Sequence, residues 1–380
     1  MNKTKNILFF FIIFIWIDKL YAIDTNAQQA IVIDYNTNEV LFEKNADEII
    51  PPASMTKIMT VYVAFDRLNS TDLNINDTCI ISPKAYRMGG SRTFLEIDDK
   101  VTINDLLKGI IIQSGNDASV ALAECLSGTE KAFAKLMNIY AKKLNLENTN
   151  FINSSGWPVD DHYSTVRDIG ILSNELIKNF PNLYSYFSEK SFTYNDIKQP
   201  NRNKLLSNFQ GADGLKTGYV KASGWGISTS AFRNDRRITV VIDGTNSTRS
   251  RLNESINLLQ WAFSQTSQKT LLKKNQIIKN VDVWLGNKPS VNLIVDKDII
   301  SIISFDQLKS INANIEYEKP IPAPIKKGQK LGEMKINISS KNPIIVPLVA
   351  QNDVKDINPL MRIFAAIKYI VFGTSFDEKK

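Results

Sequence analysis

The stretch "PPASMTKIMT" at residues 51–60 decides how the rest of the chain is interpreted, because two prolines precede a helix-like run in which Lys57 follows Ser54 by three positions. Proline suits the entry to a helix, where a missing backbone N–H costs nothing. Three positions are almost one helical turn, so the Ser54 hydroxyl and the Lys57 amine are expected on one face, within hydrogen-bonding reach. The spacing fits an activated nucleophile with its base, and it also fits an ordinary helix surface.

A lysine base imposes a further requirement. Its amine has an ordinary pKa of about 10.4 and is protonated at neutral pH, so burial or another cation has to lower that pKa. Imidazole is a poor alternative, because the one histidine, His162, lies in the loop-like stretch "GWPVDDHYST". We expect His162 to be a surface loop residue. No G-x-S-x-G or H-E-x-x-H motif is present, and we expect neither a metal nor a cofactor.

A second motif lies in "IIIQSGNDASVALAECL", residues 110–126. Apolar residues recur at helical spacing from Ala118 to Leu126, which predicts a helix there. Ser114 and Asn116 precede it and are suited to cap it. Alternatively, they lie on a loop beside Ser54, where the hydroxyl relays protons and the amide holds a substrate amide.

A third motif lies in "GADGLKTGYVKASGWGISTSA", residues 211–231, with Lys216, Thr217 and Gly218 at the start of a strand-like run. A hairpin partner, "RRITVVI", follows Asn234 and Asp235. Lys216 is either a solvated strand end or the second cation that the lysine base requires. In the second case it also meets the terminal carboxylate of a peptide.

The three motifs together, S-x-x-K, S-x-N and K-T-G at gaps of 60 and 102 residues, resemble those of the serine acyltransferases that react with penicillin. The later segments "ITVVIDGTNSTRSRLNESINLLQWAF", "VDVWLGNKPSVNLIV" and "KPIPAPIKKGQKLGEM" narrow the likeness. They are similar to D-alanyl-D-alanine carboxypeptidases, the low-molecular-mass penicillin-binding proteins of the bacterial envelope. The resemblance runs from about Thr25 to the C-terminus.

The resemblance implies an α/β (α+β) domain of the serine β-lactamase/transpeptidase type, in which an antiparallel sheet has helices on both faces. It also implies a small all-β C-terminal domain and a terminal amphipathic helix. One departure is Val220, at a position that often carries threonine. The resemblance implies that Arg251 helps to bind the substrate carboxylate, and the nearby Arg249 is the alternative. The implied catalytic residues are Ser54, Lys57, Ser114 and Asn116, and the implied substrate-binding residues are Lys216, Thr217, Gly218, Tyr219 and Arg251.

The implied activity is removal of the terminal D-alanine from peptidoglycan pentapeptides ending in D-Ala-D-Ala, through an acyl-enzyme on Ser54. β-Lactams are expected to acylate the same serine. Class A β-lactamases use an additional glutamate for deacylation. No E-x-x-L-N segment occurs between the second and third motifs. The nearest segment is "ELIKN" at Glu175, which lacks the leucine before the asparagine. Slow release of bound penicillin is therefore expected. A β-lactamase and a catalytically silent peptidoglycan-binding scaffold remain alternatives.

The N-terminus has the layout of a secretory signal, with Lys3 and Lys5 before an apolar run from Ile7 to Ile17 and "LYA" before a cleavage site after Ala22. This predicts export, with the protein at the periplasmic face of the bacterial inner membrane. The formal net charge is +7 and falls to +5 without residues 1–22, and no nucleic-acid motif is present. Nucleic acid is therefore not an expected partner.

The C-terminal segment "NPLMRIFAAIKYIVFG" (residues 358–373) has one apolar stripe at helical spacing. It is too short to span a bilayer and is suited to lie in a membrane surface. The alternative is a helix docked on the protein. The stripe consists of Leu360, Ile363, Phe364, Ile367, Ile370 and Val371.

The predicted division of the chain is a signal peptide at 1–22, a catalytic domain at 23–268, a β-rich domain at 269–355 and the membrane-anchoring helix at 356–376. Cys79 and Cys125 are the two cysteines. A disulfide is possible outside the cytosol, but we favour buried thiols for two cysteines in so long a chain.

Overall fold

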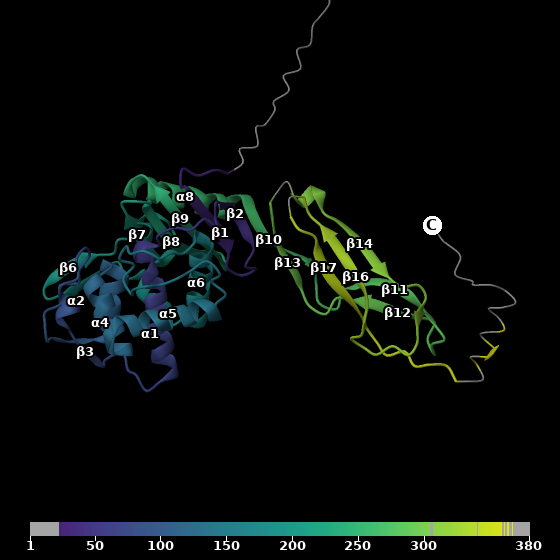
Figure 1. Ribbon diagram of the computed structural model, residues 1–380. Coiled ribbons are helices and arrows are strands. Elements are labelled where there is room, and N and C mark those ends of the chain that lie inside the picture. The colour runs from purple at the N-terminus through teal and green to yellow at the C-terminus, as the bar shows by residue number, and fades with distance from the viewer. Residues whose placement is uncertain are drawn as a thin grey trace, which may run out of the picture.

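The computed structural model describes residues 23–304, 307–339, 341–358, 361, 363, 364 and 367. We refer to residues 23–265 as the N-terminal domain and to residues 266–358 as the C-terminal module. The N-terminal domain combines a sheet with helices, and the C-terminal module is built of strands (Figure 1). The chain passes from one to the other where the last long helix, α8, leads directly into β10.

The centre of the N-terminal domain is a five-stranded sheet with the order β2-β1-β9-β8-β7. Every neighbouring pair is antiparallel. The turn between β8 and β9 consists of Asn234 and Asp235, both with positive φ (50° and 58°), as a tight hairpin requires. The strands are β1 (Gln29–Asp34), β2 (Val40–Lys44), β7 (Ala212–Val220), β8 (Gly224–Arg233) and β9 (Arg236–Thr245).

The alternation of side chains along the strands divides the domain into two cores. Ile31 and Ile33 of β1 point to a large core shared with α1, α4, α5 and α6. Ala30 and Val32 point to the opposite face, where they meet Leu258 of α8. Both faces of the sheet are therefore covered, as predicted.

The longer helices of the domain are α1 (Lys57–Ser70), α4 (Asn116–Ser127), α5 (Glu130–Lys143), α6 (Val166–Asn179) and α8 (Thr248–Gln265). The shorter ones are η1 (Ala53–Thr56), α2 (Pro83–Tyr86), α3 (Ile103–Lys108), η2 (Gly109–Gln113), η3 (Leu183–Ser188) and α7 (Leu205–Asn208). Two small antiparallel sheets of two strands complete the domain, β3 (Thr78–Ile80) with β4 (Lys100–Thr102) and β5 (Ser191–Tyr194) with β6 (Ile197–Pro200).

The C-terminal module has its own apolar core, which includes Val281, Leu293, Ile303 and Leu348. Strands β10 and β13 form an antiparallel pair, and a six-stranded sheet has the order β14-β16-β17-β12-β11-β15. This is the all-β C-terminal domain that the resemblance implied. Its elements are β10 (Thr266–Leu272), β11 (Ile277–Trp284), β12 (Ser290–Ile294), β13 (Ile299–Ser304), η4 (Gln307–Ser310), β14 (Asn312–Tyr317), β15 (Ile321–Pro322), β16 (Lys330–Asn337) and β17 (Ile344–Ala350).

Two sets of polar contacts connect the N-terminal domain to the C-terminal module. Arg236 donates to Asp34 at 2.7 Å and to the carbonyl oxygen of Thr266, the first residue of β10, at 2.7 Å. Glu39, between β1 and β2, accepts from the backbone N–H of Ile302 and from Lys341. The two regions are therefore tied at the helix-to-strand junction and at one hairpin tip.

The predicted signal peptide lies outside the described residues. Of the predicted terminal helix, residues 356–358 and Met361, Ile363, Phe364 and Ile367 are described, and the side chains of the last four are more than half exposed. Within the part of the chain that is described, no helix combines the length and hydrophobicity needed to cross a bilayer.

Candidate active site

Ser54 lies on a tight 3-10 turn, η1, that leads into α1. Pro52 precedes this turn, and its carbonyl oxygen accepts from the backbone N–H of Met55 at 3.0 Å. The prolines thus set the entry to the helix, and the turn leaves the Ser54 side chain partly exposed while Lys57 begins α1.

The Lys57 amine is fully buried beneath this turn and has three hydrogen-bond acceptors. Its Nζ lies 3.0 Å from Ser54 Oγ, 2.7 Å from Asn116 Oδ1 and 2.5 Å from the carbonyl oxygen of Ser155. Buried polar groups are costly unless they are bonded, and these three acceptors fix the amine in place. The serine and lysine of the first motif are therefore in contact.

Burial is the largest cause that lowers the pKa of Lys57 to about 7, and the charge of Arg202 is the second. Asp117 and Glu130 act in the opposite direction. Lys216 was predicted to be this cation. Its amine is itself buried, and burial together with the charge of Lys57 lowers its pKa well below the ordinary value, so the two amines oppose each other's charging. Arg202, which carries no motif, adds its charge to the effect on Lys57.

The second motif lies where η2 meets α4. Ser114 ends η2 with a positive φ of 69° and is buried. Asn116 was predicted on a loop before a helix that starts at Ala118, but it is the first residue of α4. Its amide nitrogen donates to the carbonyl oxygen of Gly89 at 2.8 Å, while its oxygen accepts from Lys57. Asn116 therefore connects the Lys57 amine to the loop that contains Gly89.

The third motif lies in the second half of β7, not at the start of the strand as predicted, because the strand begins at Ala212 and pairs with β8 along its length. β7 is the edge strand of the sheet and faces η1. A Cβ at Gly218 would approach the carbonyl oxygen of Pro52 to 3.1 Å. Glycine therefore allows the edge strand to lie close to the turn that carries Ser54.

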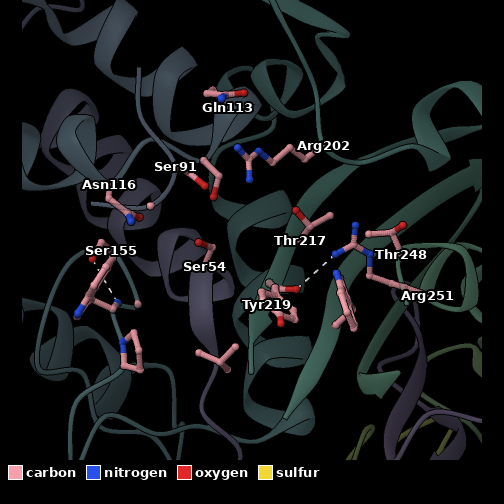
Figure 2. A pocket seen from close by; sticks show the side chains of 18 of the residues that line it. Ser54, Ser91, Gln113, Asn116, Ser155, Arg202, Thr217, Tyr219, Thr248 and Arg251 are labelled. Carbon is pink, nitrogen blue, oxygen red and sulfur yellow. Dashed lines mark hydrogen bonds between the residues drawn. The ribbon is translucent and has the colours of Figure 1, made fainter. Parts of the chain in front are cut away.

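A cavity of about 770 Å³ opens above Ser54, between the helices and the edge strand. Figure 2 shows Ser54, Asn116, Arg202 and Thr217 arranged around this space. The remaining residues of the motifs that line it are Ser114, Gly218 and Tyr219, while Lys57 and Lys216 lie beneath it. The wall formed by Tyr219 is aromatic, because its ring packs on Trp225 with centroids 4.4 Å apart.

Arg251 lines the cavity and is largely buried, whereas Arg249 is exposed and lies outside the lining. The Arg251 Nη1 donates to the carbonyl oxygens of Gly218 and Gly226 at 3.3 and 3.4 Å. Burial is the main cause that lowers the pKa of Arg251 to about 10, and the charge of Arg202 adds to it. No aspartate or glutamate lines the cavity, so its lining favours an anionic ligand.

Sequence reasoning missed Arg202 and Ser155. Arg202 follows a hairpin in "QPNRNK", where no motif marks it. Ser155 contributes a main-chain carbonyl oxygen, which any residue type would offer. The prediction for His162 was wrong: its side chain is buried and contacts Thr56, the residue between Met55 and Lys57. The Gly, Pro and Asp residues around it correctly indicated a loop, but that loop folds over the site.

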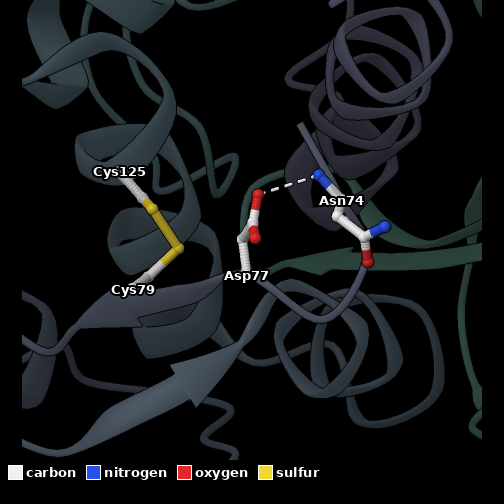
Figure 3. Close-up of a disulfide and its surroundings, with 4 residues drawn as sticks. All are labelled: Asn74, Asp77, Cys79 and Cys125. Atoms are coloured by element: carbon white, nitrogen blue, oxygen red, sulfur yellow. Dashed lines mark hydrogen bonds between the residues drawn. A yellow bond between two sulfur atoms is a disulfide. The ribbon is translucent and has the colours of Figure 1, made fainter. Parts of the chain in front are cut away.

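The cysteine prediction is also corrected, because Cys79 and Cys125 form a disulfide with Cα atoms 5.5 Å apart (Figure 3). Cys79 lies in β3 and Cys125 in the last turn of α4, the helix that begins with Asn116. The packing of α4 on β3 brings them together, and a separation of 46 residues gave no sign of it. The bridge secures the far end of the helix that supplies Asn116.

The sheet covered on both faces, and the buried lysine beside a serine at its edge strand, define a serine hydrolase of the penicillin-binding class. Residues 18–246 match the family described as D-alanyl-D-alanine carboxypeptidase, and residues 267–356 match the C-terminal domain of penicillin-binding protein 5. The chain belongs to this carboxypeptidase family.

Similar proteins cover most of the chain. D-alanyl-D-alanine carboxypeptidase DacC of Escherichia coli (strain K12) is 38% identical over 88% of this chain and 86% of its own length. DacF of Bacillus subtilis (strain 168) is 35% identical over 87% and 86%. The crystal structure of penicillin-binding protein 5 from Haemophilus influenzae aligns with a TM-score of 0.76 at 34% identity, over 88% of this chain and 99% of that one.

Proposed function

We propose that the protein is a serine-type D-Ala-D-Ala carboxypeptidase that removes the terminal D-alanine from peptidoglycan pentapeptide stems. The observation that carries this proposal is the Lys57 amine, 3.0 Å from Ser54 Oγ and with a pKa lowered to about 7, beneath a cavity lined with cations. An amine with this pKa is partly neutral at physiological pH and can accept the serine proton.

In the proposed reaction, Lys57 takes the proton of the Ser54 hydroxyl as Oγ attacks the carbonyl carbon of the penultimate D-alanine. The backbone N–H groups of Ser54 and Tyr219 stabilise the oxyanion. When the C–N bond breaks, the amine of the leaving D-alanine receives a proton from Lys57 through Ser114. Water then hydrolyses the ester on Ser54, with Lys57 again accepting a proton. Asn116 holds the substrate amide.

The terminal carboxylate of the substrate is proposed to bind at Thr217, beside Lys216 and Arg251. Lys216 and Arg251 are both buried, and their pKa values are lowered mainly by burial, so an arriving carboxylate favours their charged forms. Arg202 is the alternative guanidinium, because it also lines the cavity and is more exposed. Comparison of Arg202→Ala with Arg251→Ala separates the two. Substitution of the residue that binds the carboxylate should raise KM for the peptide more than it slows the chemical step.

A β-lactamase is the second candidate, and the lining of the cavity argues against it. The residues that line the cavity include no glutamate or aspartate that could activate water against an acyl-enzyme. We therefore expect penicillin to remain attached to Ser54 for much longer than a peptide acyl group.

The decisive experiment is labelling with a fluorescent penicillin, followed by mass mapping of the modified peptide and by measurement of D-alanine released from a synthetic pentapeptide. We expect the label on Ser54 and loss of both activities in Ser54→Ala. Attachment to another residue would contradict the assignment. Rapid turnover of penicillin would support the β-lactamase, and labelling without D-alanine release would support the silent scaffold.

We also propose that the protein is exported and held peripherally at the periplasmic face of the inner membrane. The signal-like residues 1–22 and the apolar stripe of residues 360–371 support this. The exposure of Ile363, Phe364 and Ile367 argues against docking of these side chains on the protein. Cell fractionation of the full chain and of a chain ending at residue 357 tests it: only the full chain should sediment with membranes.

A further inference from the structure

The loop between α5 and α6 folds over the turn that carries Ser54, and three of its residues contact that turn or α1. The carbonyl oxygen of Ser155 accepts from Lys57 at 2.5 Å, and that of Ser154 accepts from the Thr60 hydroxyl at 2.6 Å. His162 Nε2 lies 2.8 Å from Thr56 Oγ1. Of these three contacts, only the last depends on side chains from both partners.

The proton on the His162 ring can be assigned from its neighbours. Nδ1 lies 3.1 Å from the backbone nitrogen of Ile152, and this N–H can only donate, so Nδ1 is the acceptor. In the neutral ring the proton is therefore on Nε2, which donates to Thr56 Oγ1. Burial is the main cause that lowers the pKa of His162 to about 4, the charge of Lys57 also lowers it, and Glu130 opposes both. The ring is neutral at the pH at which the enzyme is proposed to act.

Thr56 occupies a critical place, because it lies in the turn between the proposed nucleophile and its base. Its side chain is 1% exposed and that of His162 is 6% exposed, so water does not substitute readily for either partner. The turn has little space to shift, since a Cβ at Gly156 would lie 1.7 Å from the carbonyl oxygen of Ala53. The loop and the turn therefore fit in one arrangement, and the His162–Thr56 hydrogen bond fixes it.

We propose that His162 is a positioning residue of the acyl-transfer site, which holds Thr56 by an Nε2–H donor and thereby sets the distance between Ser54 Oγ and Lys57 Nζ. It does not touch the substrate and takes no proton in the reaction. This inference rests on the proposed function, because its effect is defined on acylation of Ser54.

Two near-isosteric substitutions separate the two hydrogen bonds of His162. In His162→Gln the amide nitrogen reaches the position of Nε2 and can still donate to Thr56, while the acceptor for Ile152 is lost. In His162→Asn the amide oxygen takes the position of Nδ1 and still accepts from Ile152, while Thr56 loses its donor. Both variants lose one hydrogen bond, so their folded states are expected to be destabilised to a similar extent.

We expect the first-order acylation rate of Ser54 by a fluorescent penicillin at pH 7.5 to fall about tenfold to a hundredfold in His162→Asn, with the penicillin dissociation constant unchanged. His162→Gln should stay within about threefold of the wild type. Thr56→Val should resemble His162→Asn, and the double variant His162→Asn/Thr56→Val should be no slower than either, as expected for two partners of one bond.

Thr149→Val is the matched control, because Thr149 lies in the same loop and its hydroxyl contacts Asp168 and Ser164, neither of which belongs to the turn. It should lower the thermal midpoint without slowing acylation. Equal acylation rates in His162→Gln and His162→Asn, or a fall in thermal midpoint alone, would overturn the positioning role. Failure of the wild type to be acylated at Ser54 would instead overturn the proposed function, so the two failures are distinguishable.

Discussion

The N-terminal domain and the C-terminal module differ most in what they bury. Among the described residues, the module buries a single polar side chain, Ser301, inside a core of Val, Ile and Leu. The N-terminal domain buries many aspartate, glutamate, lysine and arginine side chains, namely Asp34, Lys57, Asp117, Glu130, Asp168, Lys216, Arg236, Asp243, Arg251 and Glu254. A buried charge is costly unless it is paired and hydrogen-bonded, so a fold that keeps many of them has a use for at least some.

The buried charges of the N-terminal domain are of two kinds. Asp117 accepts from the backbone N–H groups of Thr93 and Phe94, and Asp34 pairs with Arg236 at 2.7 Å. These groups organise loops and the domain junction. Lys57 and Lys216, in contrast, form no ion pair with a carboxylate of the described residues and lie beneath the cavity. The proposed chemistry requires such amines without an ion-pair partner, and the described part of the module buries no lysine.

The largest effect should come from removing the unpaired amine itself. Lys57→Met keeps the volume and removes the base, so we expect acylation of Ser54 by penicillin to slow by about a thousandfold to ten-thousandfold. The free energy of unfolding should be unchanged or higher than that of the wild type, because a buried amine that is costly to charge is replaced by an apolar side chain. Stopped-flow labelling and chemical denaturation measure the two quantities.

Lys131→Met on the exposed face of α5 is the control for Lys57→Met, and it should leave both quantities unchanged. Acylation of Lys57→Met at a rate near that of the wild type would show that another group takes the serine proton.

The second effect concerns the disulfide, which exists only in the N-terminal domain of the described chain. Closing a loop of 46 residues restricts the unfolded chain by about 4 kcal/mol in the chain-entropy account. Cys79→Ala/Cys125→Ala should therefore lower the thermal midpoint of the N-terminal domain by several degrees. Calorimetry should show the transition of the C-terminal module at its original temperature, and a shift of both transitions would mean that the two regions unfold as one.

The same contrast explains what could be predicted from the sequence. The prolines before Ser54, the spacing to Lys57 and the Asn234–Asp235 turn are local features, so their structure follows from neighbouring residues. The sheet with two covered faces and the all-β module came from a resemblance that spans three distant motifs. Both were confirmed, whereas the boundaries of the domains stay predictions.

The features that sequence reasoning missed depend on contacts between distant segments. His162 was expected at the surface because its neighbours are loop residues, but the loop folds against Thr56, 106 positions earlier. Arg202 lowers the pKa of Lys57 from a segment without a motif. The disulfide depends on how α4 packs against β3. No local pattern records such contacts, because tertiary packing alone brings the partners together.

The third effect is a destabilisation of the C-terminal module that should leave the N-terminal domain unaffected. Leu293→Ala removes a fully buried side chain from its apolar core and should cost about 3 kcal/mol. Calorimetry should show a lower midpoint for the module alone, while D-alanine release from a soluble pentapeptide is unchanged. Leu258→Ala, equally buried beneath the central sheet, is the matched variant and should lower the midpoint of the N-terminal domain instead. A loss of D-alanine release in Leu293→Ala would mean that the active site depends on the module.

The fourth effect follows from the pKa of Lys57, which is lowered to about 7. The reaction requires the neutral amine, and below pH 7 the neutral fraction falls about tenfold per pH unit, or about 1.4 kcal/mol. The rate of acylation by penicillin should therefore be nearly constant above pH 8. Between pH 6.5 and 5 the logarithm of this rate should fall by one for each pH unit. A midpoint of the pH–rate profile above pH 9 would show that the amine keeps its ordinary pKa. A rate that does not change with pH would show that the Lys57 amine is not the base.

The smallest effect concerns the contact between the two regions at Glu39. Glu39→Gln keeps an oxygen that can accept from the backbone N–H of Ile302 and loses the ion pair with Lys341. Both side chains are partly exposed, so the loss should be at most about 1 kcal/mol. The distribution of distances between spin labels on α8 and β16 should become broader in Glu39→Gln, while the thermal midpoints of both regions stay nearly constant.

Glu43→Gln on the same hairpin is the control, because its partner Arg167 lies within the N-terminal domain. An unchanged distance distribution would mean that the contacts of Arg236 at the start of β10 are sufficient to hold the module, since they join the two regions where the chain itself connects them.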